Sequence, residues 1–291
     1  MSDYVCSTEL REFEKQFNHI VNVTHHDHIT VFDDLLTYII TAFNPEPYQN
    51  PHWRYTQEQN QLFHQLMVEW LNVLQRMIDA RGWYDAFGDF FMSNVGRTSQ
   101  QYKGQFFTPH TICDFMAKIS LDDRDEVTEP RVTCNGFGKR VVINDSACGS
   151  GRLLLAAHAT NCERKTRACY FIGEDIDRIC CKMAAINMCA HGMFGEVVCH
   201  NTLTEPHKAN FGYIINEGLY PFPGCPTIRY FDDDPMRFVC TRAALGWMTE
   251  TWQKREVSHK VTETEKNLVP VVEEQPDKRK IPEQLTLNFF E

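Results

Sequence analysis

The sequence predicts an α/β protein with a Rossmann-like, doubly wound sheet and an N-terminal helical domain. From residue 141 onward, short apolar segments alternate with helical runs, which is the pattern of a mostly parallel sheet covered by helices. A glycine-rich turn stands where the first of these strands meets its helix, and the residues before 100 show helical spacing only. The expected domains are a helical domain over 1–100, an α/β domain over 101–250 and a flexible charged tail over 251–291.

Three segments before residue 100 place apolar residues along one face of a helix. Residues 32–43 do so with two acids in the favourable first turn. The longer run 57–81 ends at Gly82, a plausible C-terminal cap. A third helix is expected over 84–94. Such stripes are typical of the core of a helical bundle, so we assign them no ligand.

Histidine and cysteine usage does not favour a metal site. The run His25-His26-Asp27-His28 offers good ligand types, but adjacent residues rarely converge on one ion, so we interpret it as a solvated loop. The twelve cysteines lack Cys-x-x-Cys spacing and indicate reduced thiols in a cytoplasmic protein. No apolar run is long enough for a membrane span, and no secretion leader follows Met1.

The segment around which the chain is organised is the turn Asp145-Ser-Ala-Cys-Gly-Ser-Gly151. It follows an apolar strand at 141–143 and precedes a helical run at 152–158. Gly149 and Gly151 allow a sharp bend against which a ligand can lie, and the free amides of the next helix suit a carboxylate or phosphate. The alternative for this segment is a tight turn that binds nothing.

A second strand, expected at 170–173, leads into Glu174-Asp175-Ile176-Asp177 and a helix over 178–191. An acid at the end of the second strand, roughly twenty or more residues past a glycine turn, is what doubly wound folds use to hold ribose hydroxyls. Asp175 is the candidate. Capping of the next helix is its alternative role, but Asp177 is equally well placed for that.

Two motifs in order, Gly104-Gln-Phe-Phe-Thr-Pro109 and the turn at 145–151, resemble the S-adenosylmethionine-dependent adenine DNA methyltransferases that include the modification subunits of type I restriction systems. The resemblance covers roughly residues 100–216. Ser146 stands where that family usually has proline. The resemblance implies S-adenosyl-L-methionine as cofactor, DNA as substrate, and 101–250 as the methyltransferase domain.

The resemblance also implies roles for residues around the turn. Asp145 would face the methionine amine, Ile176 would pack on the adenine ring, and Asn201 would meet the adenine amine, although a simple polar turn would look the same. Thr108 and Pro109 would lie near the methionine end, or Thr108 could cap the helix that Pro109 begins. We do not interpret Cys148 as a nucleophile, because nothing basic is fixed beside it. The expected cofactor-binding residues are Phe107, Thr108, Pro109, Asp145, Ala147, Cys148, Gly149, Gly151, Asp175, Ile176 and Asn201.

The expected catalytic loop departs from the family. A third strand is expected at 195–199 and a fourth at 211–215, after which active members carry Asn/Asp-Pro-Pro-Phe/Tyr. Here the sequence is Asn216-Glu-Gly-Leu-Tyr220-Pro-Phe. Asn216 could still accept from the adenine amine and Tyr220 could stack on a flipped base, but the two rigidifying prolines are missing.

The net charge of −10 argues against a broad basic face that holds DNA unaided. After an expected helix at 236–250 no target-recognition domain fits, so the chain would need a partner subunit. The tail ends in Gln284-Leu285-Thr-Leu287-Asn-Phe289, which resembles the peptide by which replication proteins dock on the sliding clamp. The alternative is a tail that folds back on its own domain.

Two hypotheses follow. The first is an adenine N6 DNA methyltransferase of the restriction-modification type that depends on S-adenosylmethionine and acts with a partner. The second is a catalytically inactive module with the methyltransferase fold that works by binding DNA-associated proteins, for example the sliding clamp through residues 284–290. A methyltransferase for small molecules or proteins is the third alternative, and the two DNA-type motifs disfavour it.

Overall fold

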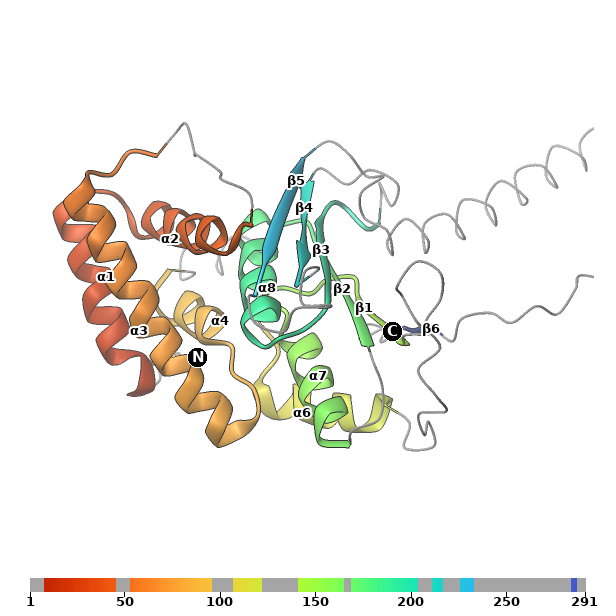
Figure 1. The fold of residues 1–291 in the computed structure, drawn as a ribbon. Coiled ribbons are helices and arrows are strands. Elements are labelled where there is room, and N and C mark those ends of the chain that lie inside the picture. The colour runs from red at the N-terminus through yellow and green to blue at the C-terminus, as the bar shows by residue number, and fades with distance from the viewer. Residues whose placement is uncertain are drawn as a thin grey trace, which may run out of the picture.

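A computed structural model describes residues 8–45, 53–95, 107–121, 141–164, 169–203, 211–216, 226–232 and 284–286. Within these ranges a bundle of helices lies on one side of a mixed six-stranded sheet (Figure 1). The fold is therefore α/β, as predicted. The doubly wound arrangement and the three domain boundaries stay predictions.

The bundle begins with the short η1 (Thr8–Leu10) and α1 (Arg11–Thr24), which the sequence analysis did not single out. The next two helices are α2 (His28–Phe43), four residues longer than predicted, and α3 (Gln57–Arg81), with the predicted bounds. The helix expected over 84–94 is divided into α4 (Ala86–Phe90) and a π-helical turn, η2 (Phe91–Val95). π-Helical turns of this kind often stand at functional sites.

Aromatic side chains fill the centre of the bundle. Phe17 packs edge-on against Phe90 with ring centroids 4.8 Å apart, and Trp70 stacks on Phe87 at 5.0 Å. All four are fully buried. Aromatic pairs in these geometries stabilise the fold beyond the free energy gained by burial alone. The bundle therefore has a packed aromatic core, as the helical stripes predicted.

Local chemistry explains where the helices begin and end. His25 ends α1 in the left-handed conformation, and the Asp27 carboxylate caps α2 by accepting from the Thr30 amide at 2.9 Å. Thr56 forms a capping box at the start of α3, and Gly82, with φ of 83°, ends it as predicted. The run from His25 to His28 is thus a helix connection, and the described residues contain no cluster that could hold a metal ion.

The sheet has the order β5-β4-β3-β2-β1-β6. Strands β1, β2, β3 and β6 are parallel, whereas β4 runs antiparallel to both β3 and β5. The bounds are β1 Val141–Asp145, β2 Cys169–Asp175, β3 Gly195–Cys199, β4 Phe211–Ile215, β5 Ile228–Asp232 and β6 Gln284–Thr286.

The position of β4 corrects the expectation for the fourth strand. Its bounds are as predicted, but its direction places Ile215 opposite Gly195, at the amino end of β3. The connection from Cys199 to Phe211 is short, and a parallel return to the sheet takes a crossover of about a dozen residues or more, usually with a helix. The residue that follows β4 therefore lies at the edge opposite to the carboxyl ends of β1 to β3.

Strand β6 pairs with β1, with Ile143 opposite Leu285. Residues 284–286 thus lie against their own domain, as the alternative interpretation of the tail predicted. Nothing in the structure or in the comparisons below supports docking of residues 284–290 on a sliding clamp, and we do not propose it. Leu287, Phe289 and the expected helix over 236–250 lie outside the described residues.

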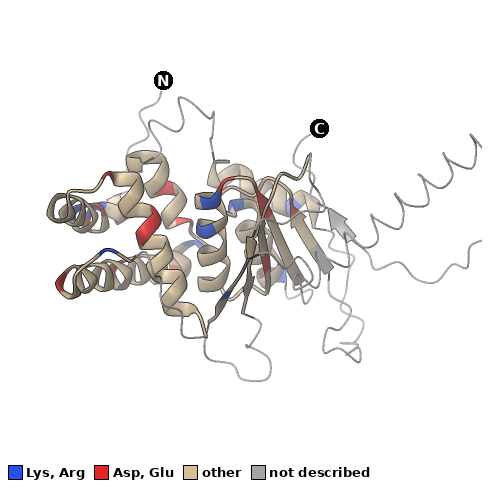
Figure 2. Cartoon of the chain, turned by 90° about the horizontal axis from the view of Figure 1, so that it is seen from above, with Lys and Arg blue, Asp and Glu red and all other residues tan. Residues whose placement is uncertain are grey.

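Helices α6 (His110–Ser120), α7 (Arg152–Arg164) and α8 (Arg178–Ala190) join the sheet to the bundle. Helix α8 packs on strands β2 to β5 and also on α2 and α4, so it stands between the two parts (Figures 1 and 2). Figure 2 shows the described basic residues dispersed among acidic ones.

None of the helices in the described ranges has the length and apolar composition needed to cross a membrane. The cysteines in these ranges are all free thiols, and most of them are buried.

Candidate functional site

The glycine turn lies between the carboxyl ends of β1 and β2. The Cys148 amide donates to the Glu174 carbonyl at 2.9 Å, and the Gly151 amide donates to the Cys148 carbonyl at 2.8 Å. Gly149 and Gly151 have φ of 55° and 87°, a region that side chains disfavour. A Cβ on Gly151 would also stand 3.4 Å from the Cβ of Ala184, so glycine lets the turn approach α8 closely.

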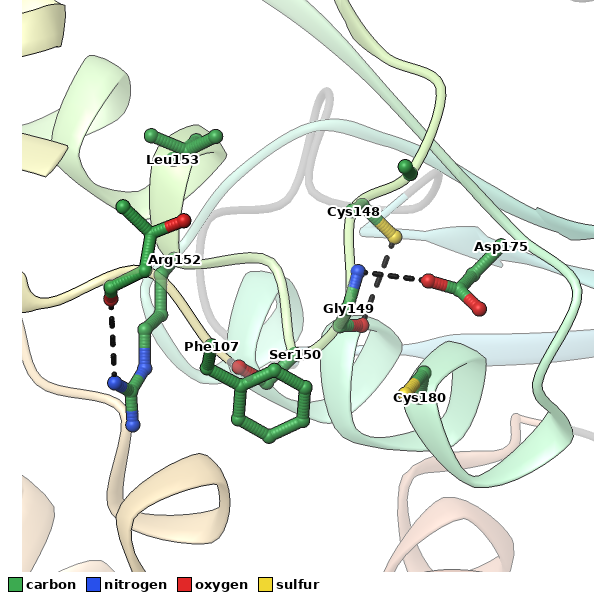
Figure 3. Close-up of a pocket in the computed structure, with 10 residues that line it drawn as sticks. Phe107, Cys148, Gly149, Ser150, Arg152, Leu153, Asp175 and Cys180 are labelled. Atoms are coloured by element: carbon green, nitrogen blue, oxygen red, sulfur yellow. Dashed lines mark hydrogen bonds between the residues drawn. The ribbon is translucent and has the colours of Figure 1, made fainter. Parts of the chain in front are cut away.

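A pocket opens on this turn (Figure 3). Its walls come from the residues just before α6, from the turn itself, and from the starts of α7 and α8. The lining residues are Phe107, Thr108, Ala147, Cys148, Gly149, Ser150, Arg152, Leu153, Asp175 and Cys180. The structure thus brings together six of the residues predicted to bind the cofactor, Phe107, Thr108, Ala147, Cys148, Gly149 and Asp175.

Asp175 points at the turn, as Figure 3 shows. One carboxylate oxygen accepts from the Gly149 amide at 2.9 Å and the other from the Asp177 amide at 2.8 Å. Burial raises the pKa of Asp175 above its usual value, although these amide bonds oppose the shift. Asp177 caps α8 by accepting from Ile179 at 2.9 Å. The capping role therefore belongs to Asp177, and Asp175 lines the pocket.

Asp145 is buried at the end of β1. One oxygen accepts from the Ala147 amide at 3.2 Å, while the buried Oδ2 has no hydrogen-bond partner among the described residues. Burial raises the pKa of Asp145 to about 7, and the charges of Asp175 and Glu174 add to the shift. Asp145 does not line the pocket formed by the described residues. An orphaned carboxylate oxygen is nevertheless suited to a cationic partner.

Two apolar side chains stand exposed beyond the ends of β2 and β3. Ile176 is 66% exposed and Leu203 is 94% exposed. The side-chain oxygen of Asn201 accepts from the Leu203 amide at 3.1 Å, as the polar-turn alternative predicted. Ile176 is thus free to contact a ligand, whereas Asn201 already has a structural role.

The segment before α6 differs from prediction in one respect. Pro109 is the N-cap residue of α6 and no side chain caps the helix, so the expectation that Thr108 caps it is wrong. The Thr108 carbonyl instead accepts from Arg152 at 3.3 Å. Phe107 lies against the turn, since a Cβ on Gly149 would meet its ring at 3.0 Å. Burial raises the pKa of the Cys148 thiol well above its usual value, which disfavours a nucleophilic thiolate.

Asn216 has a structural role within the described residues, and its catalytic role stays a prediction. Its fully buried side-chain amide donates to the carbonyls of Cys189 at 3.2 Å and Met193 at 2.7 Å, and its oxygen accepts from the Thr227 amide at 3.0 Å. These bonds tie the end of β4 to the end of α8. Because β4 runs antiparallel to β3, Asn216 lies at the edge of the sheet opposite to the pocket. Tyr220 lies outside the described residues.

Asn216→Ala is accordingly expected to lower the free energy of unfolding by about 3 kcal/mol and to leave ligand affinity unchanged. The loss combines unpaired buried polar groups with a φ of 58°, which asparagine tolerates better than alanine. Urea unfolding and calorimetry would measure the two quantities. Asn201→Ala, which removes the bond from the Leu203 amide to a partly exposed side chain, is the control for stability and should cost under about 1 kcal/mol. Loss of ligand binding in folded Asn216→Ala would contradict the structural role.

Sequence reasoning missed a buried polar network behind the pocket. Asp85, fully buried, accepts from the Gly88 amide at 2.7 Å, the Ser150 hydroxyl at 2.5 Å, Arg152 Nε at 2.6 Å and the Asn187 amide at 2.7 Å. A signal did exist. Arg152 and Asn187 are polar residues within apolar stretches, but their common partner lies far away in the sequence.

The site defines a class of protein. An α/β fold with a glycine turn and an acid at the carboxyl ends of parallel strands places its small ligands there, and the acid at the second strand is typical of ligands that carry a ribose. Residues 83–223 match the model of the N-6 DNA Methylase family, the kind of family that the two sequence motifs resemble.

Two known proteins are similar to parts of this chain. The chain is 30% identical over 112 residues to the type I restriction enzyme MpnII methylase subunit of Mycoplasma pneumoniae, an alignment that covers 38% of this chain and 18% of the relative. The type I restriction-modification methyltransferase subunit of Streptococcus thermophilus is a structural neighbour with 19% identity and a TM-score of 0.33. That comparison covers 71% of this chain and 42% of the neighbour.

Proposed function

We propose that this protein binds S-adenosyl-L-methionine in the pocket and serves as the methylase part of an adenine N6 DNA methyltransferase of the restriction-modification type. The observation that carries the proposal is the pairing of Asp175 with the Gly149 amide at 2.9 Å across the floor of the pocket. The Asp175 carboxylate, which can accept hydrogen bonds from hydroxyl groups, thus lies beside a glycine turn whose backbone a ligand can approach.

The residues present suit the chemistry of this cofactor. Asp175 would exchange its bond to Gly149 for the ribose hydroxyls, and the exposed side chains of Ile176 and Leu203 offer an apolar surface for the adenine ring. The buried, unpartnered oxygen of Asp145 suits the amine of the methionine part. When bound, the cofactor would supply the methyl group attached to its sulfonium.

The proposed transfer needs an acceptor for the hydrogens of the target amine, and the side chain of Asn216 is hydrogen-bonded within the protein at the opposite edge of the sheet. The acceptor and the surface that reads DNA would have to come from elsewhere, either from residues outside the described ranges or from a partner chain. A shared DNA surface also agrees with the net charge of −10.

The engagement of Asn216 favours a second candidate, a catalytically inactive module that keeps the ligand pocket and works by binding other macromolecules. The two candidates make the same prediction for the pocket. They differ in whether a methyl group reaches DNA.

Calorimetry with S-adenosylmethionine and with its demethylated product tests the pocket. We expect both to bind the wild-type chain, and Asp175→Ala to weaken binding by about tenfold or more through loss of a charged hydrogen bond. Asp177→Ala is the matched control. It removes an acid two residues away that caps α8, so it should cost about 1 kcal/mol of stability and little affinity.

Incorporation of labelled methyl groups into DNA then separates the candidates. Incorporation by the chain alone or with a partner subunit, lost in Asp175→Ala, supports the methyltransferase. Ligand binding without incorporation in any combination supports the inactive module. Absence of binding by the wild-type chain would contradict both.

A further inference from the structure

Arg152, the first residue of α7, is one of the residues that line the pocket, and its buried guanidinium joins the pocket wall to the bundle. Its Nε donates to Asp85 at 2.6 Å and its Nη2 to Asp89 at 2.6 Å, while Nη1 donates to the Thr108 carbonyl at 3.3 Å. It also lies over the Phe107 ring, 5.5 Å from its centroid. Phe107 and Thr108 form one wall of the pocket, whereas the two acids belong to the bundle.

The same guanidinium therefore fixes two points that are close in space but far apart along the chain. Asp89 lies within α4 and Thr108 lies just before α6. Both are bound to one planar group with a rigid set of donors, so the distance between them is fixed by its geometry. The wall formed by Phe107 and Thr108 is thus held at a set position relative to the bundle.

The floor of the pocket is tied to the bundle through the same acid. The Ser150 hydroxyl donates to Asp85 at 2.5 Å, and Asn187 of α8 bridges Asp85 at 2.7 Å and the Ser150 carbonyl at 2.9 Å. Ser150 lies inside the glycine turn, next to Gly149, against which the Phe107 ring packs. The wall, through Arg152, and the floor, through Ser150, are thus both hydrogen-bonded to the buried carboxylate of Asp85.

Asp89 is kept ionised by its neighbours in this cluster. Burial raises the pKa of Asp89, but the hydrogen bond with His110 and the charge of Arg152 outweigh it and hold the pKa below its usual value. His110 also stacks on Trp83 with centroids 4.7 Å apart and planes 13° apart. The start of α6 is therefore joined to the bundle at a second point beside the pocket wall.

We infer that Arg152 is a positioning residue for the ligand site, which it serves by holding the wall at Phe107 and Thr108 and the turn at Ser150 against the helical bundle. This inference rests on the proposed function. Arg152 lines the pocket, but each of its three guanidinium nitrogens already donates within the protein, so we assign its effect on a ligand to the residues that it holds. The bundle is then part of the ligand site although none of its helices from α1 to α4 lines the pocket.

Coupling between the network around Arg152 and ligand binding is reciprocal. It can therefore be measured as a change in the network when the ligand binds, which a purely structural role of Arg152 would not produce. If an intact network favours the ligand, the ligand must favour the intact network to the same extent. Ligand binding should therefore slow amide hydrogen exchange in residues 83–95, which belong to the bundle and lie outside the pocket.

The experiment uses the full chain, with S-adenosylmethionine and its demethylated product as probes, measured by calorimetry and by hydrogen exchange. Arg152→Lys keeps the charge but cannot reach Asp85, Asp89 and Thr108 together. We expect it to bind the probes about tenfold or more weakly and to lose the ligand-induced protection of 83–95, since the charged bonds it removes are worth at least that ratio.

Asp33→Asn is the matched control. It breaks another ion pair between the bundle and α8, Lys182 to Asp33 at 2.6 Å, and neither of these residues lines the pocket. It should leave both readouts as in the wild type. If Arg152→Lys does not fold, Asp89→Asn decides instead. Asp89 is partly exposed, and its loss leaves Arg152 paired with Asp85, so we expect a weaker probe affinity in a folded chain.

The outcomes separate the two proposals. A wild-type chain that binds neither probe overturns the proposed function and this inference with it. A wild-type chain that binds, with unchanged affinity and unchanged protection of 83–95 in folded Arg152→Lys or Asp89→Asn, overturns the positioning role alone. Equal losses in Asp33→Asn would also overturn it, because any weakened contact with the bundle would then suffice.

Discussion

Asp145→Asn is expected to be more stable than the wild type at pH 8, and its advantage should grow by about 3 kcal/mol between pH 5 and pH 8. Burial raises the pKa of Asp145 from 3.8 to about 7 in the folded protein. Between these two values the unfolded chain has released the proton and the folded chain still holds it. Wild-type stability therefore falls as the pH rises through this window and levels off above about 7, whereas asparagine carries no such proton.

Urea unfolding of both chains at several pH values measures this difference. Asp79→Asn, on the exposed face of α3, controls for the removal of one carboxylate. If the free energy of unfolding depended on pH in the same way in Asp145→Asn and the wild type, the raised pKa of the buried Asp145 carboxylate would be contradicted. The same variant should bind S-adenosylmethionine more weakly if Asp145 faces its amine, so stability and affinity should change in opposite directions. Proteins commonly keep a residue at a binding site that lowers their stability because the residue is needed for function.

Gly88→Ala is expected to lower the free energy of unfolding by about 3–5 kcal/mol, the range for breaking a buried ion pair. A Cβ on Gly88 would overlap the Asp85 carboxylate and come within 2.7 Å of the Ser150 hydroxyl. The carboxylate would have to move away from Arg152, which would leave a buried charge without its partner. Chemical unfolding of the full chain measures the loss.

Gly192→Ala separates this mechanism from ordinary glycine effects. Gly192 has φ of 69° and open space where a Cβ would stand, so its replacement should cost only the backbone strain, about 1–2 kcal/mol. If Gly88→Ala costs no more than Gly192→Ala, the network around Asp85 contributes little to stability.

The sequence was sufficient for elements whose signals are local. The bounds of α3, β3 and β4 were predicted to the residue, because periodicity, caps and short apolar runs lie within each segment. Helix α1 could have been found in the same way, since Phe13, Phe17 and Ile20 have helical spacing, although charged residues surround them. The division of the helix after Phe90 carried no comparable signal.

The candidate site was predictable where it follows from the turn and not where it depends on the path of the chain. Gly149 and Asp175 meet because parallel strands end at one edge of the sheet, which the motif order implies. The placement of Asn216 depends on the direction of β4, which apolar spacing cannot reveal, because the same five residues suit either direction. The partners of Asp85 depend on three segments that meet only in the folded protein.

The network around Asp85 also bears on how the protein is made. When a ribosome has synthesised only the first hundred residues, the chain contains Asp85 but not the side chains that pair with its carboxylate, which belong to Ser150, Arg152 and Asn187. A nascent bundle must then either leave this acid in water or bury it without its counter-charge, at a cost of several kcal/mol. We therefore expect a fragment that ends near residue 100 to be poorly folded when expressed by itself, and the bundle to mature only after α8 has left the exit tunnel.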